Sequence, residues 1–250
     1  MNPPNAVYDL LLDRAQTDEK ITALCLGLVW TFCQAQKNGK SSVGLAMSPQ
    51  IATRTLSFSG TLVGKSLAEL AGWIQEWDVY KASIGMAAIN CCINQHVLQN
   101  AVPLAAGNLA VFEHFLPQLQ GKNVVVIGRY PRIETYREQF NLTILERQPE
   151  GADYPDPACE FLLPQADWVF LSGTTLVNKT FPRLAQLSQH ATTVLMGPTV
   201  PWLPELAEFG IDYLAGVGIM NETALTQTVM EGGGMRIFEQ AVRYHVARLQ

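Results

Sequence analysis

Five short apolar segments alternate with helical or turn-rich stretches in the second half of the chain. They are Val124 to Ile127, Leu142 to Leu145, Trp168 to Leu171, Thr193 to Met196 and Tyr213 to Ala215. Strands that are apolar on both faces and joined by helices are typical of a parallel sheet covered on both sides. This half therefore predicts an α/β fold built on a doubly wound parallel sheet.

The connections between these strands restrict their order. Right-handed crossovers permit either a simple succession or a reversal around the first strand, and we favour the order 2-1-3-4-5. In such a sheet the ligand crevice opens between the first and third strands, at their carboxyl ends. The site is therefore expected along the carboxyl edge of the sheet.

The first hundred residues follow a different pattern, with strand formers first and helical spacing afterwards, which favours a smaller α+β unit. A Pro and a Gly between Asn100 and Asn108 indicate a linker, so we predict domains at 1–104 and 105–250. The expected elements are a helix over Ala6 to Arg14, an apolar strand segment over Ile21 to Gln34, a hairpin turn at Lys37-Asn38-Gly39-Lys40, a strand over Ser42 to Met47, and helices over Ser66 to Glu76 and Val79 to Asn94.

Composition excludes several classes of protein. The formal net charge is -5 and no run of Lys or Arg is present, which disfavours nucleic-acid binding. The N-terminus lacks a basic leader, and the longest apolar run, Ile21 to Cys33, is too short to cross a bilayer. Five cysteines without a Cys-x-x-Cys pair are unlike a disulfide framework or a structural zinc site. We expect a cytoplasmic protein without a membrane or nucleic-acid partner, and a homo-oligomer stays open.

Two loops at the predicted carboxyl edge carry polar groups. The first strand ends in Gly128 and Arg129, followed by Tyr130-Pro131 rather than the small residues of a dinucleotide-binding loop. Arg129 either supplies positive charge to an anionic ligand or is a solvated surface side chain. Glu146 ends the second strand, where an acid either binds a nucleotide ribose or is simply solvated.

The third strand leads into Ser172-Gly173-Thr174-Thr175-Leu176-Val177-Asn178. A glycine lets a ligand approach the backbone, and hydroxyls at a helix start suit a phosphate or carboxylate, although Thr174 could only cap the helix. We include Gly173, Thr174, Thr175 and Asn178 in the candidate ligand site.

Three further positions complete the candidate site. Gly197 and Pro198 form a rigid turn after the fourth strand. Asn90, in a helix of small residues, either points into a cleft between the domains or bridges the core. Gly233 lies in a glycine trio before a long final helix expected over Met235 to Leu249, which would place it near the cleft, unless the trio only turns the chain at the far edge.

These segments together resemble a prokaryotic family described as putative heavy-metal-chelation proteins. The resemblance covers nearly the whole chain and is carried by Ser57 to Leu70 (SFSGTLVGKSLAEL), Ser83 to Asn90 (SIGMAAIN), Val124 to Gly128 (VVVIG), Ser172 to Thr180 (SGTTLVNKT), Gly197 to Pro204 (GPTVPWLP) and Gly232 to Gly234. It implies an enolase N-terminal-like domain followed by a Rossmann-like domain, with a ligand site between them. Metal chelation is a suggestion attached to the family, and a metal or metal chelate is the cofactor that the resemblance implies.

Three functions are compatible with the sequence. The first is binding or conversion of a small anionic organic molecule, such as a cofactor or chelator precursor. The second is a nucleotide-cofactor enzyme that uses Glu146, and the third is direct metal binding without catalysis. Because no compact His, Cys or carboxylate cluster is present, a metal is expected to arrive with an organic ligand. The sequence shows no arrangement of nucleophile, base and orienting residue, so catalytic residues stay unassigned.

Overall fold

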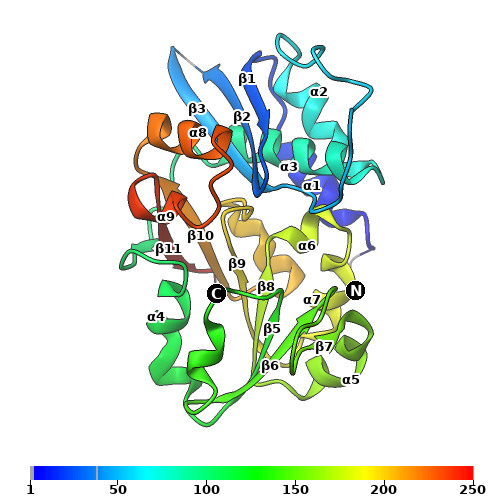
Figure 1. The fold of residues 1–250 in the computed structure, drawn as a ribbon. Coiled ribbons are helices and arrows are strands. Elements are labelled where there is room, and N and C mark those ends of the chain that lie inside the picture. Colours follow the sequence, from blue (N-terminus) through cyan, green and yellow to red (C-terminus); the bar gives the residue numbers. More distant parts are fainter. Residues whose placement is uncertain (1–2, 38, 250) are drawn as a thin grey trace.

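The chain forms two β-sheets, one small and antiparallel and the other large and mostly parallel (Figure 1). The structure is a computed structural model that describes residues 3–37 and 39–249. Asn38, in the predicted hairpin turn, lies outside the described residues, but Lys37 pairs with Lys40 on either side of it. The N-terminal part, from α1 to α3, contains the small sheet, and the rest of the chain builds the large one.

The small sheet has the order β1-β2-β3. Its elements are α1 (Ala6–Arg14), β1 (Ile21–Leu26), β2 (Trp30–Lys37), β3 (Lys40–Met47), α2 (Leu67–Ala71), η1 (Gly72–Gln75) and α3 (Val79–Ile93). The helix predicted over Ala6 to Arg14 is confirmed. The segment from Ile21 to Gln34 is wrong as a single strand, because the chain turns after Leu26 and returns as β2.

Side-chain caps fix the starts of two helices in the N-terminal part. Ser66 accepts a hydrogen bond from the Glu69 N–H before α2, and Asp78 accepts from the Tyr80 and Lys81 N–H groups before α3. A capping oxygen satisfies N–H groups that have no partner inside the helix. Helix α3 is buried along most of its length, which makes it the centre of this part.

Two glycines allow unusually close backbone approach to α3. A Cβ built on Gly44 of β3 would lie 2.0 Å from the Cys91 nitrogen. A Cβ built on Gly85 of α3 would lie 2.3 Å from the Ile74 nitrogen. Neither distance leaves room for a methyl group, so β3 and η1 contact the backbone of α3 because these residues are glycines.

The large sheet has eight strands in the order β4-β11-β10-β9-β8-β5-β6-β7. Its elements, with the helices between them, are β4 (Val102–Pro103), α4 (Ala110–Leu119), β5 (Asn123–Ile127), η2 (Ile133–Tyr136), β6 (Asn141–Glu146), β7 (Tyr154–Pro155), η3 (Asp156–Ala158), α5 (Cys159–Leu162), η4 (Leu163–Gln165), β8 (Trp168–Ser172), α6 (Thr174–Val177), α7 (Phe181–Leu187), β9 (Thr192–Met196), η5 (Pro204–Phe209), β10 (Tyr213–Ile219), α8 (Glu222–Met230), α9 (Ile237–Gln240) and β11 (Val242–Arg248).

The five strands predicted from sequence are β5, β6, β8, β9 and β10, and they are parallel to one another. Their spatial order is β6-β5-β8-β9-β10, which confirms the predicted order 2-1-3-4-5. The order reverses at β5, since β6 lies on one side of it and β8 on the other. The sheet begins with β4, whose residues precede the predicted boundary at 104/105, and that division into domains stays a prediction.

The long helix predicted over Met235 to Leu249 is wrong. Only Ile237–Gln240 is helical, and Val242–Arg248 forms β11, which runs antiparallel to β10. Along β11, buried Val242, Tyr244 and Val246 alternate with the more exposed Arg243 and His245. Alternation of buried and exposed residues is the pattern of a strand, and burial on the sheet outweighs helix propensity here.

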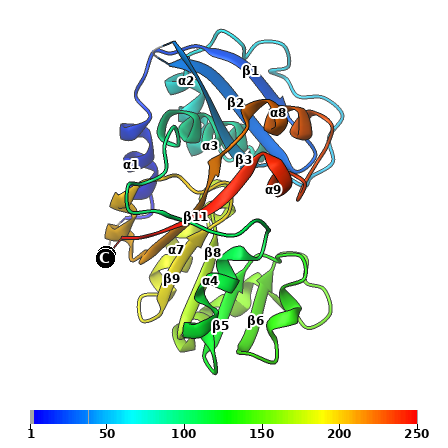
Figure 2. The same cartoon turned by 90° about the vertical axis from the view of Figure 1, so that its left-hand side faces the viewer.

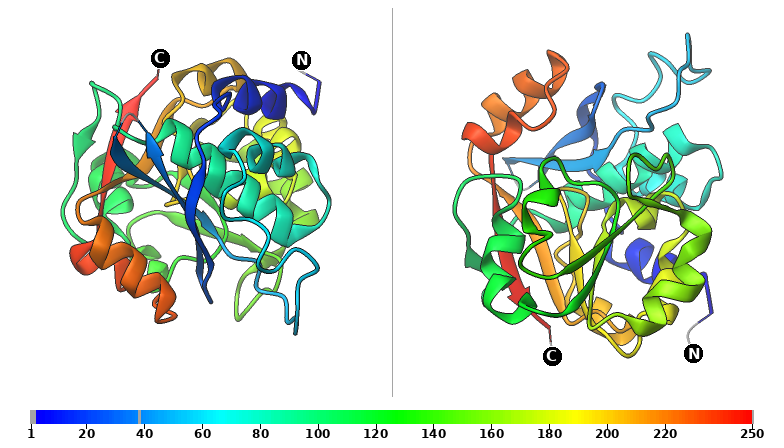
Figure 3. Two further views of the ribbon diagram at one scale, coloured as in Figure 1. Left: turned by 90° about the horizontal axis from the view of Figure 1, so that it is seen from above. Right: turned by 60° about the horizontal axis from the view of Figure 1, so that its bottom comes forward.

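Both faces of β5, inside the large sheet, are buried. Val124 and Val126 of β5 share one apolar cluster with α4, whereas Val125 and Ile127 share the other with α6, α7 and the N-terminal part. Figure 3 shows α4 and α7 on opposite sides of the large sheet. No helix within the described ranges 3–37 and 39–249 is long and apolar enough to cross a membrane.

The chain between β10 and β11 lies beyond the carboxyl edge of the large sheet and reaches the small sheet. Helix α8 contacts β1 and β2, and Figure 2 shows α8 and α9 beside the small sheet. The Trp30 Nε1 donates a hydrogen bond to the Gly234 carbonyl at 3.0 Å. Residues far apart in the sequence therefore join the two sheets.

The contact between β3 and α3 predicts opposite effects at two glycines. Gly44→Ala should lower the free energy of unfolding by about 3 kcal/mol, because its methyl group would overlap the backbone of α3. Gly72→Ala should raise it by roughly 0.5 kcal/mol, because Gly72 is in the αR region and a Cβ there meets no atom within 4 Å. Urea denaturation of both variants measures the difference, and equal stabilities would contradict the packing.

Candidate functional site

The loops after β5, β8 and β9 meet at the carboxyl edge of the large sheet. Gly128 has φ 92°, and a Cβ built on it would lie 3.6 Å from the Ser172 Cβ. Gly197 has φ 115°, and a Cβ built on it would lie 3.7 Å from the Tyr130 hydroxyl. Both conformations favour glycine. The structure thus brings Gly128 and Gly197 to one place, with Tyr130 and Ser172 between them.

The hydroxyl groups of Tyr130, Ser172 and Thr174 lie in a row at this edge, and we call them the hydroxyl row. Ser172 Oγ lies 3.2 Å from Thr174 Oγ1, and Thr174 Oγ1 donates to the Met47 sulfur of β3 at 3.4 Å. Burial raises the pKa of the Tyr130 phenol, while its hydrogen bond with Ser172 acts in the opposite direction. The phenol is therefore protonated at neutral pH and can donate a hydrogen bond. Sequence reasoning missed Ser172, Tyr130 and Met47, although Ser172 directly precedes the predicted glycine.

The remaining candidates in the β8 loop hold the loop itself. Thr175 is 2% exposed and donates to the Ser172 carbonyl at 2.7 Å. The Asn178 side-chain Oδ1 accepts from the Thr180 N–H at 3.1 Å and from the Thr180 hydroxyl at 2.6 Å. A Cβ on Gly173 would lie 3.0 Å from the Val200 nitrogen, so this glycine permits contact with the β9 loop. Thr174, Thr175 and Asn178 are the predicted side chains of this loop. Thr174 belongs to the hydroxyl row, whereas Thr175 and Asn178 bind the loop itself.

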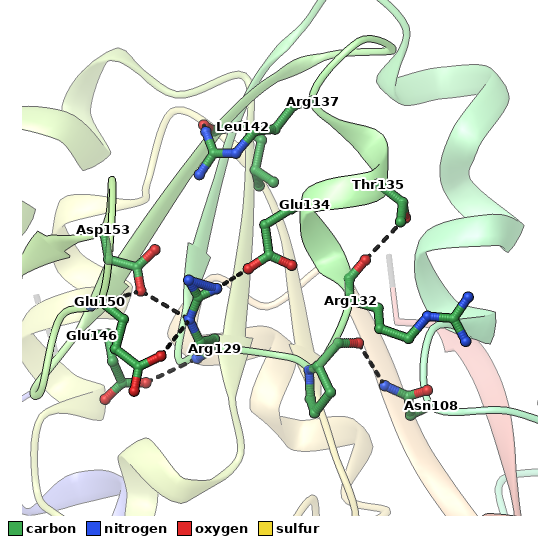
Figure 4. Close-up of polar contacts among 11 residues, drawn as sticks. Asn108, Arg129, Arg132, Glu134, Thr135, Arg137, Leu142, Glu146, Glu150 and Asp153 are labelled. Carbon is green, nitrogen blue, oxygen red and sulfur yellow. Dashed lines mark hydrogen bonds and ion pairs between the residues drawn. The ribbon is translucent and has the colours of Figure 1, made fainter.

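Arg129 lies among carboxylates (Figure 4). Its guanidinium contacts Glu134, and its Nε lies 3.1 Å from Asp153 and 4.0 Å from Glu150. The contact with the Asp153 Oδ2 is an ion pair without hydrogen-bond alignment, because the buried Arg129 Nε has no hydrogen-bond partner. Three carboxylates around one guanidinium leave the region negative. Arg129 is neither a solvated side chain nor a free cation for an anionic ligand.

Glu146 is also engaged by its own surroundings. One carboxylate oxygen accepts from the Arg129 N–H at 2.9 Å, and the other accepts from the Arg147 N–H at 2.7 Å. The bond from Arg129 joins the ends of β5 and β6, and the bond from Arg147 is local. A ribose would have to displace them, so the geometry favours a structural role over the nucleotide role.

Asn90, in the last turn of α3, bridges β3 and the loop after β9. Its buried amide nitrogen donates to the Leu45 carbonyl at 2.7 Å and to the Thr199 carbonyl at 2.9 Å. The Thr199 hydroxyl in turn accepts from the Met47 N–H at 3.0 Å. Of the two roles considered for Asn90, the structure shows the bridge.

Pro198 lines a small cavity at the same junction. The cavity measures about 10 Å³ and is bounded by residues of β3 and β10 and by Asn94, which directly follows α3. That volume admits about one water molecule. An organic ligand is accommodated here only if the β9 loop and the N-terminal part move apart.

Gly233 does not have the surroundings that were expected. The glycine trio lies beyond the carboxyl edge, but between α8 and α9 rather than at the start of a long helix. A Cβ on Gly233 would lie 2.4 Å from the Thr228 methyl, and one on Gly232 would lie 2.9 Å from Leu28. The trio therefore permits close packing on α8 and on the β1–β2 turn, and this geometry gives no support to ligand binding by Gly233.

The metal that the family resemblance suggests would need a group of His, Cys, Asp or Glu side chains as ligands. Within the ranges 3–37 and 39–249, His, Cys, Asp and Glu side chains form no group of three or more that could hold a metal ion. The described residues thus do not fit a resident metal centre.

Lys179 fastens the β8 loop to the N-terminal part. Its Nζ donates to the Val177 carbonyl at 3.0 Å and lies 5.4 Å from the centre of the Tyr8 ring. The Tyr8 hydroxyl donates to the Leu176 carbonyl of the same loop at 3.2 Å. Burial lowers the pKa of Lys179 to about 8. A partly desolvated ammonium group therefore lies next to the candidate site.

This shift predicts a pH dependence that Lys179→Met removes. Unfolded Lys179 titrates near 10.5, so between about pH 8 and 10.5 the unfolded chain binds more protons than the folded one. Over that window the stability of the wild type should rise relative to the variant, by about 1 kcal/mol once solvent exposure of the amine is discounted. Urea denaturation of the wild type and of Lys179→Met at about pH 8 and about pH 10.5 measures this difference in the free energy of unfolding. A difference that does not change with pH would contradict the assignment.

Comparisons with known proteins identify relatives over the whole chain. The profile of the DUF364 family, described as "Putative heavy-metal chelation", matches residues 110–248, and that of DUF4213, with the same description, matches residues 8–93. An uncharacterised protein of Methanocaldococcus jannaschii is 29% identical over 222 residues, which cover 84% of this chain and 83% of that protein.

Two crystal structures of DUF364 family proteins with unknown function have the same fold. The protein from Desulfitobacterium hafniense has a TM-score of 0.82 and 28% identity, covering 98% of both chains. The protein from Pyrococcus horikoshii has a TM-score of 0.83 and 22% identity, covering 98% of this chain and 99% of that one. Since the DUF364 profile matches more than half of the chain, this protein belongs to the DUF364 family, described as "Putative heavy-metal chelation".

Proposed function

We propose that this protein binds a small organic anion at the carboxyl edge of its large sheet, between the loops after β5, β8 and β9. The observation that carries the proposal is the reversal of strand order at β5. Loops diverge where the order reverses, and open α/β sheets bind their ligands there. Gly128 of the β5 loop and Ser172 at the end of β8 lie together at that point.

The hydroxyl row supports an anionic ligand. Thr174 donates to the Met47 sulfur, which is a weak acceptor, so a carboxylate or phosphate oxygen would be a better partner. Tyr130 adds a phenol held in its protonated form. Because the charge of Arg129 is already engaged, recognition would depend on these neutral donors.

We further assign the large sheet to the Rossmann-like class and the N-terminal part to the enolase N-terminal-like class. In this assignment Met47 of β3 closes the site from the side of the N-terminal part, and the ligand lies between the two domains. The contacts of Asn90 and of Met47 with Thr199 would then control how far the domains separate.

The proposed link to heavy metals runs through the organic ligand. The family description supports a role in metal handling, while the described side chains do not form a metal-binding group. A metal bound as its complex with an organic acid accounts for both observations. The two alternative functions have less support. A nucleotide-cofactor enzyme would need Glu146, whose carboxylate already accepts from backbone N–H groups. Direct metal binding would need a group of donor side chains that the described residues do not form.

Thr174→Val should weaken the anion about tenfold, since it removes one hydrogen bond to a charged group. The probes are di- and tricarboxylates and sugar phosphates, each with and without Ni²⁺ or Cu²⁺, and the measurement is the ligand-induced rise in Tm. Thr175 should be left intact, because its hydroxyl supports the loop.

Thr22→Val is the matched control, because Thr22 is an exposed threonine of β1 whose hydroxyl donates to the Gln34 carbonyl of the neighbouring strand β2. It should respond to the probes like the wild type. Tyr130→Phe keeps the ring that packs against Phe112 and should reduce the same Tm rise. Compounds that stabilise the wild type and Thr174→Val equally would refute the proposed site.

A further inference from the structure

A second recess, separate from the hydroxyl row, opens where the segment before α4 faces α9. Its volume is about 350 Å³. Sites for small molecules occupy roughly 300–1,000 Å³, so this recess is large enough for one. Met235 and Phe238 contribute apolar surface, and the Phe238 ring is fixed by stacking on Tyr244 at 5.0 Å.

The polar groups of the recess are unequally engaged. Asn108 uses its amide nitrogen to hold the Pro131 carbonyl at 3.1 Å, which fixes the wall next to the β5 loop (Figure 4). Arg236 lines the recess and is exposed, and its guanidinium has no ion-pair or hydrogen-bond partner among residues 3–37 and 39–249. Glu239 is the one carboxylate among the lining residues of this part of the structure.

The backbone on the opposite wall adds donors. Gly107 has φ 132°, which favours glycine, and a Cβ there meets no atom within 4 Å. The N–H groups of Gly107 and Asn108 donate to no described backbone carbonyl. Free N–H groups and an unpaired guanidinium together outweigh the single carboxylate of Glu239, and they favour an anionic group beside an apolar surface.

We propose that this recess is a binding site for an organic anion that carries an aromatic or other apolar body. The anionic group contacts Arg236 and the Gly107–Asn108 backbone, and the apolar body lies on Met235 and Phe238. This site does not depend on the proposed function, because none of the residues of the hydroxyl row lines it.

The test uses two fluorescent probes that differ by one anionic group. 8-Anilinonaphthalene-1-sulfonate carries a sulfonate on an apolar body, and N-phenyl-1-naphthylamine is the same body without it. The wild type should bind the sulfonate saturably with one site per chain. Arg236→Gln should weaken it about tenfold, as expected for loss of a charge-assisted contact, and should leave the neutral probe unchanged.

Arg54→Gln is the matched control, since Arg54 is an exposed arginine of the N-terminal part outside the recess and its loss changes the net charge equally. It should bind the sulfonate within about twofold of the wild type. Thr174→Val should also bind it normally, which separates this site from the hydroxyl row.

Met235→Glu is a second variant, and it should fold normally because Met235 is 50% exposed. It places a negative charge at the recess and should weaken the sulfonate more than the neutral probe, whereas Met230→Glu, at an exposed methionine outside the recess, should not. Absence of saturable binding by the wild type would overturn the proposal. Sulfonate affinity that is unchanged in both Arg236→Gln and Met235→Glu would also overturn it.

Discussion

The contact of α3 with β3 on one side and with the β9 loop on the other is the constraint on which the arrangement of the two sheets depends. Gly44 lets the strand reach the helix backbone, and Asn90 of the same helix donates to both β3 and Thr199. A buried amide that satisfies two backbone carbonyls, one in β3 and one in the β9 loop, is costly to remove, because each carbonyl would lose this partner. The position of Met47 above Thr174 follows from this contact.

Sequence patterns predicted the parallel part of the large sheet well because its strands are apolar on both faces and regularly spaced. Strand β11, between β4 and β10, was missed although Val242, Tyr244 and Val246 alternate with Arg243 and His245. A short alternating segment also fits one face of a helix, and pairing with β10 decides between them. Strands of two residues, such as β4 and β7, leave no periodic pattern at all.

The candidate site shows the same division between local and long-range information. Strand ends and glycines placed Gly128, Thr174 and Gly197 at one edge from sequence alone. The surroundings of Arg129 could not be predicted, since Glu150 and Asp153 approach it from a loop about twenty residues further along the chain. Likewise, the role of Asn90 depends on Thr199, which is 109 residues away.

The hydrogen bond from Trp30 to the Gly234 carbonyl spans 204 residues. During synthesis the small sheet is made long before α8 and the glycine trio that pack on its β1–β2 turn. Contacts of such sequence separation close late, since a long loop must be ordered before they form. The nascent N-terminal part therefore exposes the apolar surface around Trp30, which is 8% exposed in the folded protein, until α8 and the glycine trio have been made.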